Sequence, residues 1–303
     1  MSRKKFKGVG VTKGYRCFQV FNYLIMLCVC AVVILPLYYM VIVSISDGAA
    51  VMTGQVKLLP VGFSLRAYRA AMKDGYFLGS YWNTIAITVV GTIINLAMTT
   101  LCAYPLSRRD LKGRKALMRI AVFTMFFTGG MIPTYMLVTS LGLGNTYWAL
   151  WLPGAISVYN MIIMRTNFES IPIELTEAAY IDGANDLRIL WSIILPLSKA
   201  IIWTMILFYA VGHWNGFFNA MLYLSEKSKY PIQLFVRSVV LSGDTLSMSM
   251  ASYNSSTEMG AELLAEDAAK YAIVIMSMLP ILVVFPIVSR HFKDGVMMGA
   301  IKG

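Results

Sequence analysis

Charged residues are scarce in this 303-residue chain, where Asp, Glu, Lys and Arg together make up 14%. Soluble globular domains carry about 25% charged residues, so this shortage argues against a soluble protein. A mean hydropathy of +0.66 and a 58% share of hydrophobic residues indicate a membrane protein. The net charge of +11 does not indicate nucleic-acid binding, because the basic residues cluster beside long apolar runs instead of forming one surface.

Residues that carry enzyme chemistry are also few. The chain has two histidines, His213 and His291, which lie far apart, and it contains no HExxH or GxSxG motif. It has no Gly-Lys dipeptide, so the GxxxxGK[ST] loop that binds nucleotide phosphates is absent. We therefore expect neither an enzyme nor a protein with a cofactor. Any ATP-driven step would need a separate chain.

Cysteine is limited to four residues, all in or beside long apolar runs. Cys28 and Cys30 are two positions apart, so on a helix they point to different faces and cannot bind one metal together. We interpret Cys17, Cys28, Cys30 and Cys102 as small apolar residues without a disulfide or metal role.

Long apolar runs dominate what remains. A helix needs about 20 apolar residues to cross a bilayer. Six segments meet that test, at about residues 18–44, 83–106, 116–139, 146–165, 197–224 and 271–291. The first run is too long for a signal peptide, so we expect a retained helix. The sequence predicts an all-α polytopic protein, with a basic tail over 1–17, one transmembrane domain over 18–291 (core about 78–291) and a tail over 292–303.

Lysine and arginine predict the orientation of these segments. Six basic residues precede Phe18, five lie between Arg108 and Lys115, and three follow Ser289. With six spans, all three groups lie on the same side, and such groups mark the cytoplasmic side. We therefore expect a membrane protein with both termini in the cytoplasm.

Two segments have backbone signals of their own. The third run reads FFTGGMIPTY, and Gly129, Gly130 and Pro133 predict a kink or break there. Such a break either lies against a cavity or is a packing kink, and the sequence leaves both open. The outer stretch from Leu65 to Met72 predicts a short amphipathic helix.

The fourth connection differs from the other inner segments because it is acidic. Between Arg165 and Pro196 it contains Glu169, Glu174, Glu177, Asp182 and Asp186 against Arg165 and Arg188. An acidic cytoplasmic patch avoids anionic lipid and attracts a basic protein surface, although it is also compatible with a solvated loop. Residues Glu177 to Ala179 are typical of the first turns of a short helix, and Gly183 is expected to end it. The helical pattern resumes from Leu187.

The loop reads IPIELTEAAYIDGANDLRILWSIILPLS and resembles the EAA loop of ABC importer permeases, the binding-protein-dependent inner-membrane components. The family pattern has seven fixed positions, which here are Glu177, Ala178, Ala179, Gly183, Ile193, Leu195 and Pro196. Asp182 and Ala184 complete the Asp-Gly-Ala that is common in its sugar branch. Leu190 and Ala200 depart from it, where Phe and a second Pro are frequent. Stretches such as NTIAITVVGTIINL and HFKDGVMMGAIKG extend the resemblance to a complex-saccharide subgroup over nearly the whole chain.

The resemblance implies that residues 166–196 form a coupling loop that docks on a separate ABC ATPase. Glu177 would pair with a basic residue of the ATPase, Ala178 and Ala179 would allow close approach, and Gly183, with Asp182 and Ala184, would form the turn. The implied partners are two ATPase subunits, a second and different permease, an extracellular solute-binding protein and a sugar. The implied location is the bacterial plasma membrane, whose lipid would surround the spans.

The fifth run carries polar residues in a mostly apolar stretch. On a continuous helix, Tyr209, His213, Asn215 and Asn219 fall on one face together with small residues. Amides and phenols suit sugar hydroxyls, so these four are candidates for lining the substrate pathway. They are also compatible with hydrogen bonds to neighbouring helices.

Other functions fit the chain less well. A secondary transporter or channel usually buries ionisable residues at mid-membrane, whereas the basic residues here lie near the ends of the apolar runs. A membrane enzyme would need a catalytic constellation. An ABC permease for an amino acid or peptide remains compatible with the EAA loop, and uptake measurements would separate it from a sugar permease.

Overall fold

The computed structural model describes residues 13–242 and 268–286, and every regular element in these two ranges is a helix. The chain divides into two compact units. The first comprises residues 1–69 and 255–275, and the second comprises residues 70–254 and 276–303. The predicted C-terminal tail and most of the N-terminal tail lie outside the described residues.

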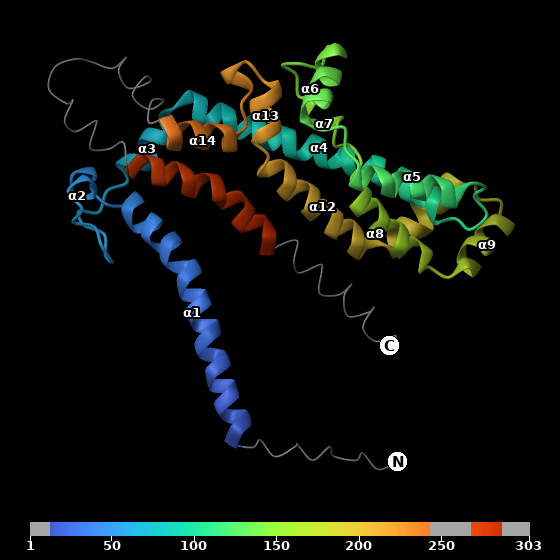
Figure 1. Cartoon of the computed structure of the whole chain (residues 1–303), viewed down its shortest axis with the longest axis horizontal. Coiled ribbons are helices and arrows are strands. Elements are labelled where there is room, and N and C mark those ends of the chain that lie inside the picture. Colours follow the sequence, from blue (N-terminus) through green and yellow to red (C-terminus); the bar gives the residue numbers. More distant parts are fainter. Residues whose placement is uncertain (1–12, 243–267, 287–303) are drawn as a thin grey trace. The chain divides into compact units, whose positions relative to one another are not determined.

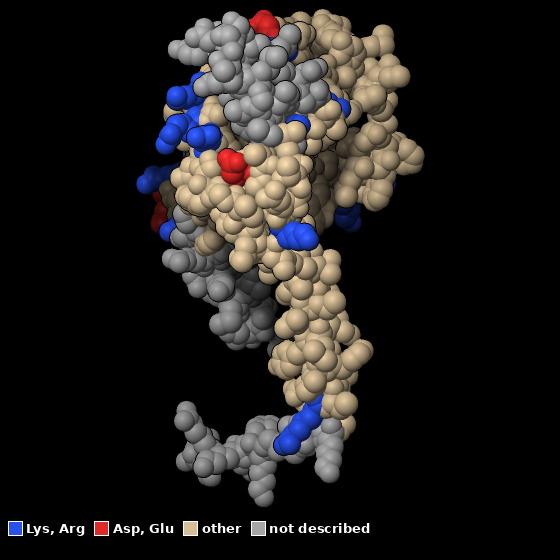
Figure 2. Space-filling view, turned by 90° about the vertical axis from the view of Figure 1, so that its left-hand side faces the viewer, with Lys and Arg blue, Asp and Glu red and all other residues tan. Residues whose placement is uncertain are grey.

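The first unit is built around α1 (Lys13–Ser44), which begins before the predicted start at residue 18. Its side chains are largely apolar and exposed, as lipid-facing side chains are. Figure 2 shows this helix without charge along most of its length. Its end packs through Ile42 and Val43 against α2 (Gly48–Met52), and Ser44 Oγ lies 2.7 Å from Tyr68 Oη in α3 (Arg66–Lys73). The predicted short helix over 65–72 is therefore present.

The second unit is organised by α4 (Gly75–Ser107), which packs against α12 (Lys199–Trp214) and α8 (Val158–Glu169) (Figure 1). The Asp74 carboxylate accepts hydrogen bonds from the first backbone amides of α4, so it caps the start of that helix. The buried residues of α4 recur every three or four positions, as expected for one packed helix face.

The other regular elements of the second unit are short: α5 (Arg114–Phe126), α6 (Met131–Ser140), α7 (Trp148–Trp151), α9 (Ile173–Ile181), α10 (Asp186–Ile189), the π-helical turn Leu190–Ile194, α11 (Leu195–Leu197), α13 (Phe218–Tyr223), the 3-10 turn Lys227–Lys229 and α14 (Ile232–Ser242). A last helix, Ala268–Pro286, continues from the first unit into the second.

Three predicted spans are not single helices. The third is broken between α5 and α6, which meet at 110°, so the predicted break is present and is larger than an ordinary kink. The fourth, predicted as one segment over 146–165, is not one continuous helix. Residues 152–157, which include Pro153 and Gly154, separate α7 from α8, because proline and glycine favour a break in the helix.

The predicted fifth span also differs from one continuous helix. Its start is bent by 86° between Asp186–Leu197 and Lys199–Trp214. Its helix ends at Trp214 and resumes as α13 only at Phe218. Three helices are long and apolar enough to cross a membrane, or up to five elements if each bent pair is one span. The chain is therefore an all-helical protein with three to five candidate membrane helices in its described part.

Candidate functional site

The acidic loop folds as two short helices around a tight turn. Gly183 has a φ of +76°, a left-handed conformation that glycine adopts without steric cost. Gly183 N donates to Tyr180 O at 3.0 Å, and Ala184 N donates to Ala179 O at 2.9 Å. This is the double hydrogen bond of a Schellman motif, which satisfies the last carbonyls of α9. The predicted helix end at Gly183 is thus observed.

The second short helix starts from its own cap. The Asn185 side chain accepts a hydrogen bond from Arg188 N at 2.8 Å, so Asn185 is the N-cap of α10. The helix continues without interruption into the π-helical turn and α11, which contains Pro196. The chain then bends at Ser198 into α12. Two caps in five residues therefore fix the shape of the loop locally.

The outer surface of this loop combines acidic and apolar side chains. Glu177, Ala178, Asp182 and Gly183 are exposed, whereas Ala179 is buried and Ala184 is half-buried. Large apolar side chains beside them are also exposed, with Ile181 at 87% and Trp191 at 70% of their surface. Exposed apolar patches of this kind mark interaction surfaces.

Four side chains join the loop to the end of α4. Arg108 Nη2 donates to Tyr180 Oη at 2.9 Å, and Tyr180 Oη donates to the Asp186 carboxylate. Tyr104 Oη donates to the same carboxylate at 3.4 Å. Partial burial and the hydrogen bond to Asp186 raise the pKa of Tyr180, so its hydroxyl stays protonated and can donate.

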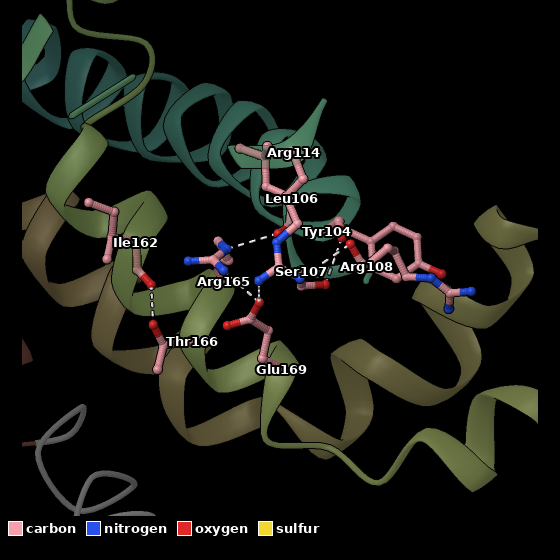
Figure 3. A network of polar contacts seen from close by, with 9 residues as sticks. All are labelled: Tyr104, Leu106, Ser107, Arg108, Arg114, Ile162, Arg165, Thr166 and Glu169. Atoms are coloured by element: carbon pink, nitrogen blue, oxygen red, sulfur yellow. Dashed lines mark hydrogen bonds and ion pairs between the residues drawn. The ribbon is translucent and has the colours of Figure 1, made fainter. Parts of the chain in front are cut away.

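A second polar cluster joins the end of α4 to α8 and α5 (Figure 3). Arg165 Nε donates to Leu106 O at 2.8 Å, and its Nη2 donates to Glu169 Oε1 at 2.6 Å. Arg114 pairs with the same carboxylate oxygen. Glu169, from the end of α8, therefore joins α8 to the start of α5, while Arg165 joins α8 to α4.

These two clusters border an open groove with a volume of about 640 Å³. Its lining includes Arg108, Arg109, Glu169, Glu174 and Glu177, so both charge signs meet there. Beneath the loop, one apolar core runs from α4 through α8 and α9 to α12, and it includes Tyr104, Met164, Ala179, Leu190 and Met205. The loop therefore packs into the same continuous core as α4, α8 and α12.

The predicted pathway residues divide into two pairs. Tyr209 Oη lies 2.6 Å from Thr99 Oγ1, and His213 Nε2 lies 2.6 Å from Asn95 Oδ1, so both side chains bond to α4. Asn215 and Asn219 are exposed, on either side of the break between α12 and α13. The structure thus does not present the four on one helix face, because the helix on which the prediction relied ends at Trp214.

Two residues that the sequence analysis missed complete this region. Asn95 Nδ2 donates to Gly154 O at 2.6 Å and to Ala155 O at 3.0 Å, in the break between α7 and α8. An added Cβ at Gly91 would lie 2.5 Å from His213 Nε2. Asn95 could have been identified from the sequence as a polar amide in an otherwise apolar run. Its hydrogen-bond partners could not, because nothing in the sequence identifies them.

Comparisons with known proteins agree on one family. The profile of the family described as "Binding-protein-dependent transport system inner membrane component" matches residues 9–296. The protein LplC of Bacillus subtilis (strain 168) is 42% identical over 292 residues, which cover 96% of this chain and 97% of LplC. The polygalacturonan/rhamnogalacturonan transport system permease protein YtcP of the same organism is 39% identical over 288 residues, which cover 95% and 99%.

Solved structures agree with this assignment. One chain of a bacterial ABC transporter involved in the import of the acidic polysaccharide alginate is 35% identical to this chain and superposes with a TM-score of 0.84. The match covers 93% of this chain and 98% of that one. A chain of an alginate ABC transporter in complex with an alginate pentasaccharide-bound periplasmic protein is 15% identical, with a TM-score of 0.54, and supports the fold alone.

Proposed function

Because this chain belongs to the binding-protein-dependent transport system inner-membrane component family, we propose that it is the permease of an ABC importer for oligosaccharides. It is a membrane permease subunit and not an enzyme, since a separate ATPase hydrolyses the ATP in such importers. Of the relatives named above, YtcP is a permease of a polygalacturonan/rhamnogalacturonan transport system, and the 35% identical chain belongs to a transporter involved in alginate import. They support a carbohydrate as the cargo over an amino acid or a peptide.

We infer that the importer contains further chains. An ATPase supplies the energy, a second and different permease completes the pore, and an extracellular binding protein delivers the sugar. The chain that is 35% identical belongs to a bacterial ABC transporter, which supports the presence of an ATPase. The described part of the chain has a broad exposed apolar surface, which suits contact with lipid and with a second permease.

For the membrane topology we propose six spans with both termini in the cytoplasm. Three long helices and two bent pairs supply up to five elements. The interrupted segment that contains α7 and α8 is the proposed sixth. The basic residues that follow α4, including Arg108 and Arg109, support a cytoplasmic position for that end of the helix.

The single observation that carries the coupling role is the exposed surface of α9 and its turn. Glu177 and Ala178 are exposed beside the apolar Ile181 and the Gly183 turn. We propose that the ATPase binds this surface, with Glu177 facing a basic residue and with Ala178, Ala179, Asp182, Gly183 and Ala184 shaping the contact. The part of the loop that follows the turn shares a core with α4, α8 and α12 through Ile189, Leu190 and Ile194, so its displacement would move these helices.

For the substrate pathway we propose Asn215 and Asn219. Both are exposed at a helix break, and irregular backbone at membrane depth is tolerated where it lines a cavity. Tyr209 and His213 then act indirectly, because their hydrogen bonds to Thr99 and Asn95 hold α12 against α4.

A pull-down tests the coupling role. The tagged chain is co-expressed with the candidate ATPases and second permeases of the same genome, and the experiment is repeated with Glu177→Lys and Gly183→Pro. We expect the wild type to retain the ATPase and both variants to lose it while still inserting in the membrane. Retention of the ATPase by both variants would exclude this loop as the docking element. Glu174→Gln, on the same helix, is the matched control.

Uptake measurements test the cargo. Cells with and without the genes of the whole importer, its binding protein included, are supplied with radiolabelled oligogalacturonide, alginate oligosaccharide, an amino acid or a dipeptide. We expect gene-dependent uptake of an oligosaccharide alone. Gene-dependent uptake of only the amino acid or the dipeptide would contradict the proposed substrate class.

A further inference from the structure

Four side chains outside the EAA pattern connect the end of α4 to both sides of the Gly183 turn. Tyr104 and Arg108 lie one helical turn apart at the end of α4, Tyr180 is in the last turn of α9, and Asp186 begins α10. Their hydrogen bonds run from Arg108 to Tyr180 to Asp186, and from Tyr104 to Asp186.

We propose that these four residues, called the α4 latch below, are positioning residues that transmit movement of the docked coupling loop to α4. The inference rests on the proposed function, in which α9 binds the ATPase. It adds that docking alone does not produce transport, because the loop must also be held at a fixed angle to α4. The latch side chains are assigned no contact with the ATPase or the sugar.

The packing of α9 explains why such a connection is needed. Only Thr176 and Ala179 of this helix are buried, whereas Ile181 is almost fully exposed. Two small buried side chains offer little apolar area to resist rotation of the helix. The turn that follows is held by backbone hydrogen bonds, and Gly183 itself has no side chain to pack. Without the latch, α9 could turn against α4 when a force is applied to it.

The geometry of the latch suits this purpose. The guanidinium carbon of Arg108 lies 5.2 Å from the centre of the Tyr180 ring, so Arg108 restrains the ring as well as the hydroxyl. Asp186 accepts from two hydroxyls, one in α9 and one in α4. The side chain of Arg108 is 22% exposed, so these polar contacts are partly shielded from water. Both sides of the turn are therefore tied to the same helix end.

Tyr180→Phe is the sharpest test, because it removes one hydroxyl and keeps the ring. The full importer, with its ATPase, second permease and binding protein, is reconstituted in proteoliposomes. The probe is whichever radiolabelled oligosaccharide, oligogalacturonide or alginate oligosaccharide, the wild type transports. We expect the ATPase to stay bound and the sugar transported per ATP hydrolysed to fall about three- to ten-fold, as loss of one or two hydrogen bonds would allow. Tyr76→Phe, at the outer end of α4, should leave this ratio unchanged.

Two further variants separate positioning from general stability. Asp186→Ala, which removes the acceptor, should lower the same ratio, and the Tyr180→Phe/Asp186→Ala double variant should lower it little further than Asp186→Ala alone, because both changes break the same connection. Arg108→Lys keeps the positive charge but loses the planar guanidinium group that bonds to Tyr180, so it should also lower the sugar transported per ATP hydrolysed.

The outcomes distinguish this inference from the function on which it rests. An unchanged ratio in Tyr180→Phe and in Arg108→Lys, with the ATPase bound, would overturn the latch and leave the docking role intact. Loss of the ATPase from Tyr180→Phe would also overturn it, since Tyr180 would then belong to the docking surface. Retention of the ATPase by Glu177→Lys would instead contradict the proposed docking role itself.

Discussion

His213 Nε2 lies 2.6 Å from Asn95 Oδ1, and this contact joins α12 to α4. The amide nitrogen of the same Asn95 donates to the carbonyls of Gly154 and Ala155, in the break between α7 and α8. One buried side chain therefore binds three segments of the second unit. It also satisfies backbone carbonyls that the break between α7 and α8 leaves without helical partners, which is the condition for irregular backbone at membrane depth.

This packing predicts that Gly91→Ala destabilises the protein. The added Cβ would meet three ring atoms of His213 at 2.5 to 2.9 Å, so the imidazole would have to move away from Asn95. Overpacking of this kind costs about 1–3 kcal/mol, more than the helix-forming gain of alanine over glycine. The expected result is a lower melting temperature of the purified complex, measured by fluorescence.

Gly79→Ala is the matched control, because Gly79 lies on the same helix and its added Cβ would meet nothing within 4 Å. It should melt at the wild-type temperature or above. In a His213→Ala background the Gly91→Ala change should become nearly neutral, since the clash is gone. An equal drop in both backgrounds would rule out the His213 contact as the cause.

The sequence predicted the turn at Gly183 because its signals are local. A short helical stretch and a glycine lie next to each other, and each has a conformational preference of its own. The break near Gly129 and Gly130 was predicted for the same reason. Local chemistry decided both features, so no knowledge of distant contacts was needed.

The prediction that one helix face of the fifth run presents all four pathway residues was wrong, because that feature depends on distant contacts. The prediction assumed a continuous helix from Tyr209 to Asn219, whereas the helix ends at Trp214. The partners of Tyr209 and His213 come from α4, more than a hundred positions away in sequence. Likewise, Arg108 reads as a basic residue that marks orientation, and only the folded chain shows that it bonds to Tyr180.

The bend between α5 and α6 predicts that alanine substitutions at two adjacent glycines differ greatly in their effect on stability. Gly130 has φ +85° and ψ 171°, a region that is essentially restricted to glycine. Gly130→Ala should therefore destabilise the protein by about 1–3 kcal/mol, whereas Gly129→Ala, whose Cβ would meet nothing within 4 Å, should have little effect. Thermal melting of the two purified variants measures the difference. Equal melting temperatures would show that the strained conformation is not retained.

Asn145 predicts a graded response to substitution. It has a φ of +57°, and its side chain accepts from Ser225 N and Glu226 N while donating to the Glu226 carboxylate at 2.6 Å. Asn145→Gly loses the side-chain bonds but fits the backbone, whereas Asn145→Ala loses the bonds and adds left-handed strain of about 1 kcal/mol. The melting temperature should fall in the order wild type, Gly, Ala. A more stable Ala variant would contradict the left-handed backbone.

The same contact predicts a dependence of stability on pH. The hydrogen bond from Asn145, followed by the contact with Lys229, lowers the pKa of Glu226 in the folded protein. A carboxylate with a lowered folded pKa contributes stability above its unfolded pKa, near 4.5, and loses that contribution as the pH falls through the folded value. The melting temperature of the wild type should therefore exceed that of Glu226→Gln near pH 7, and the gap should shrink below about pH 4. In an Asn145→Ala background the gap near pH 7 should already be small, because the main cause of the lowered pKa is gone. A gap that stays constant across this pH range would mean that the ionised carboxylate does not stabilise the connection between Asn145 and the segment after α13.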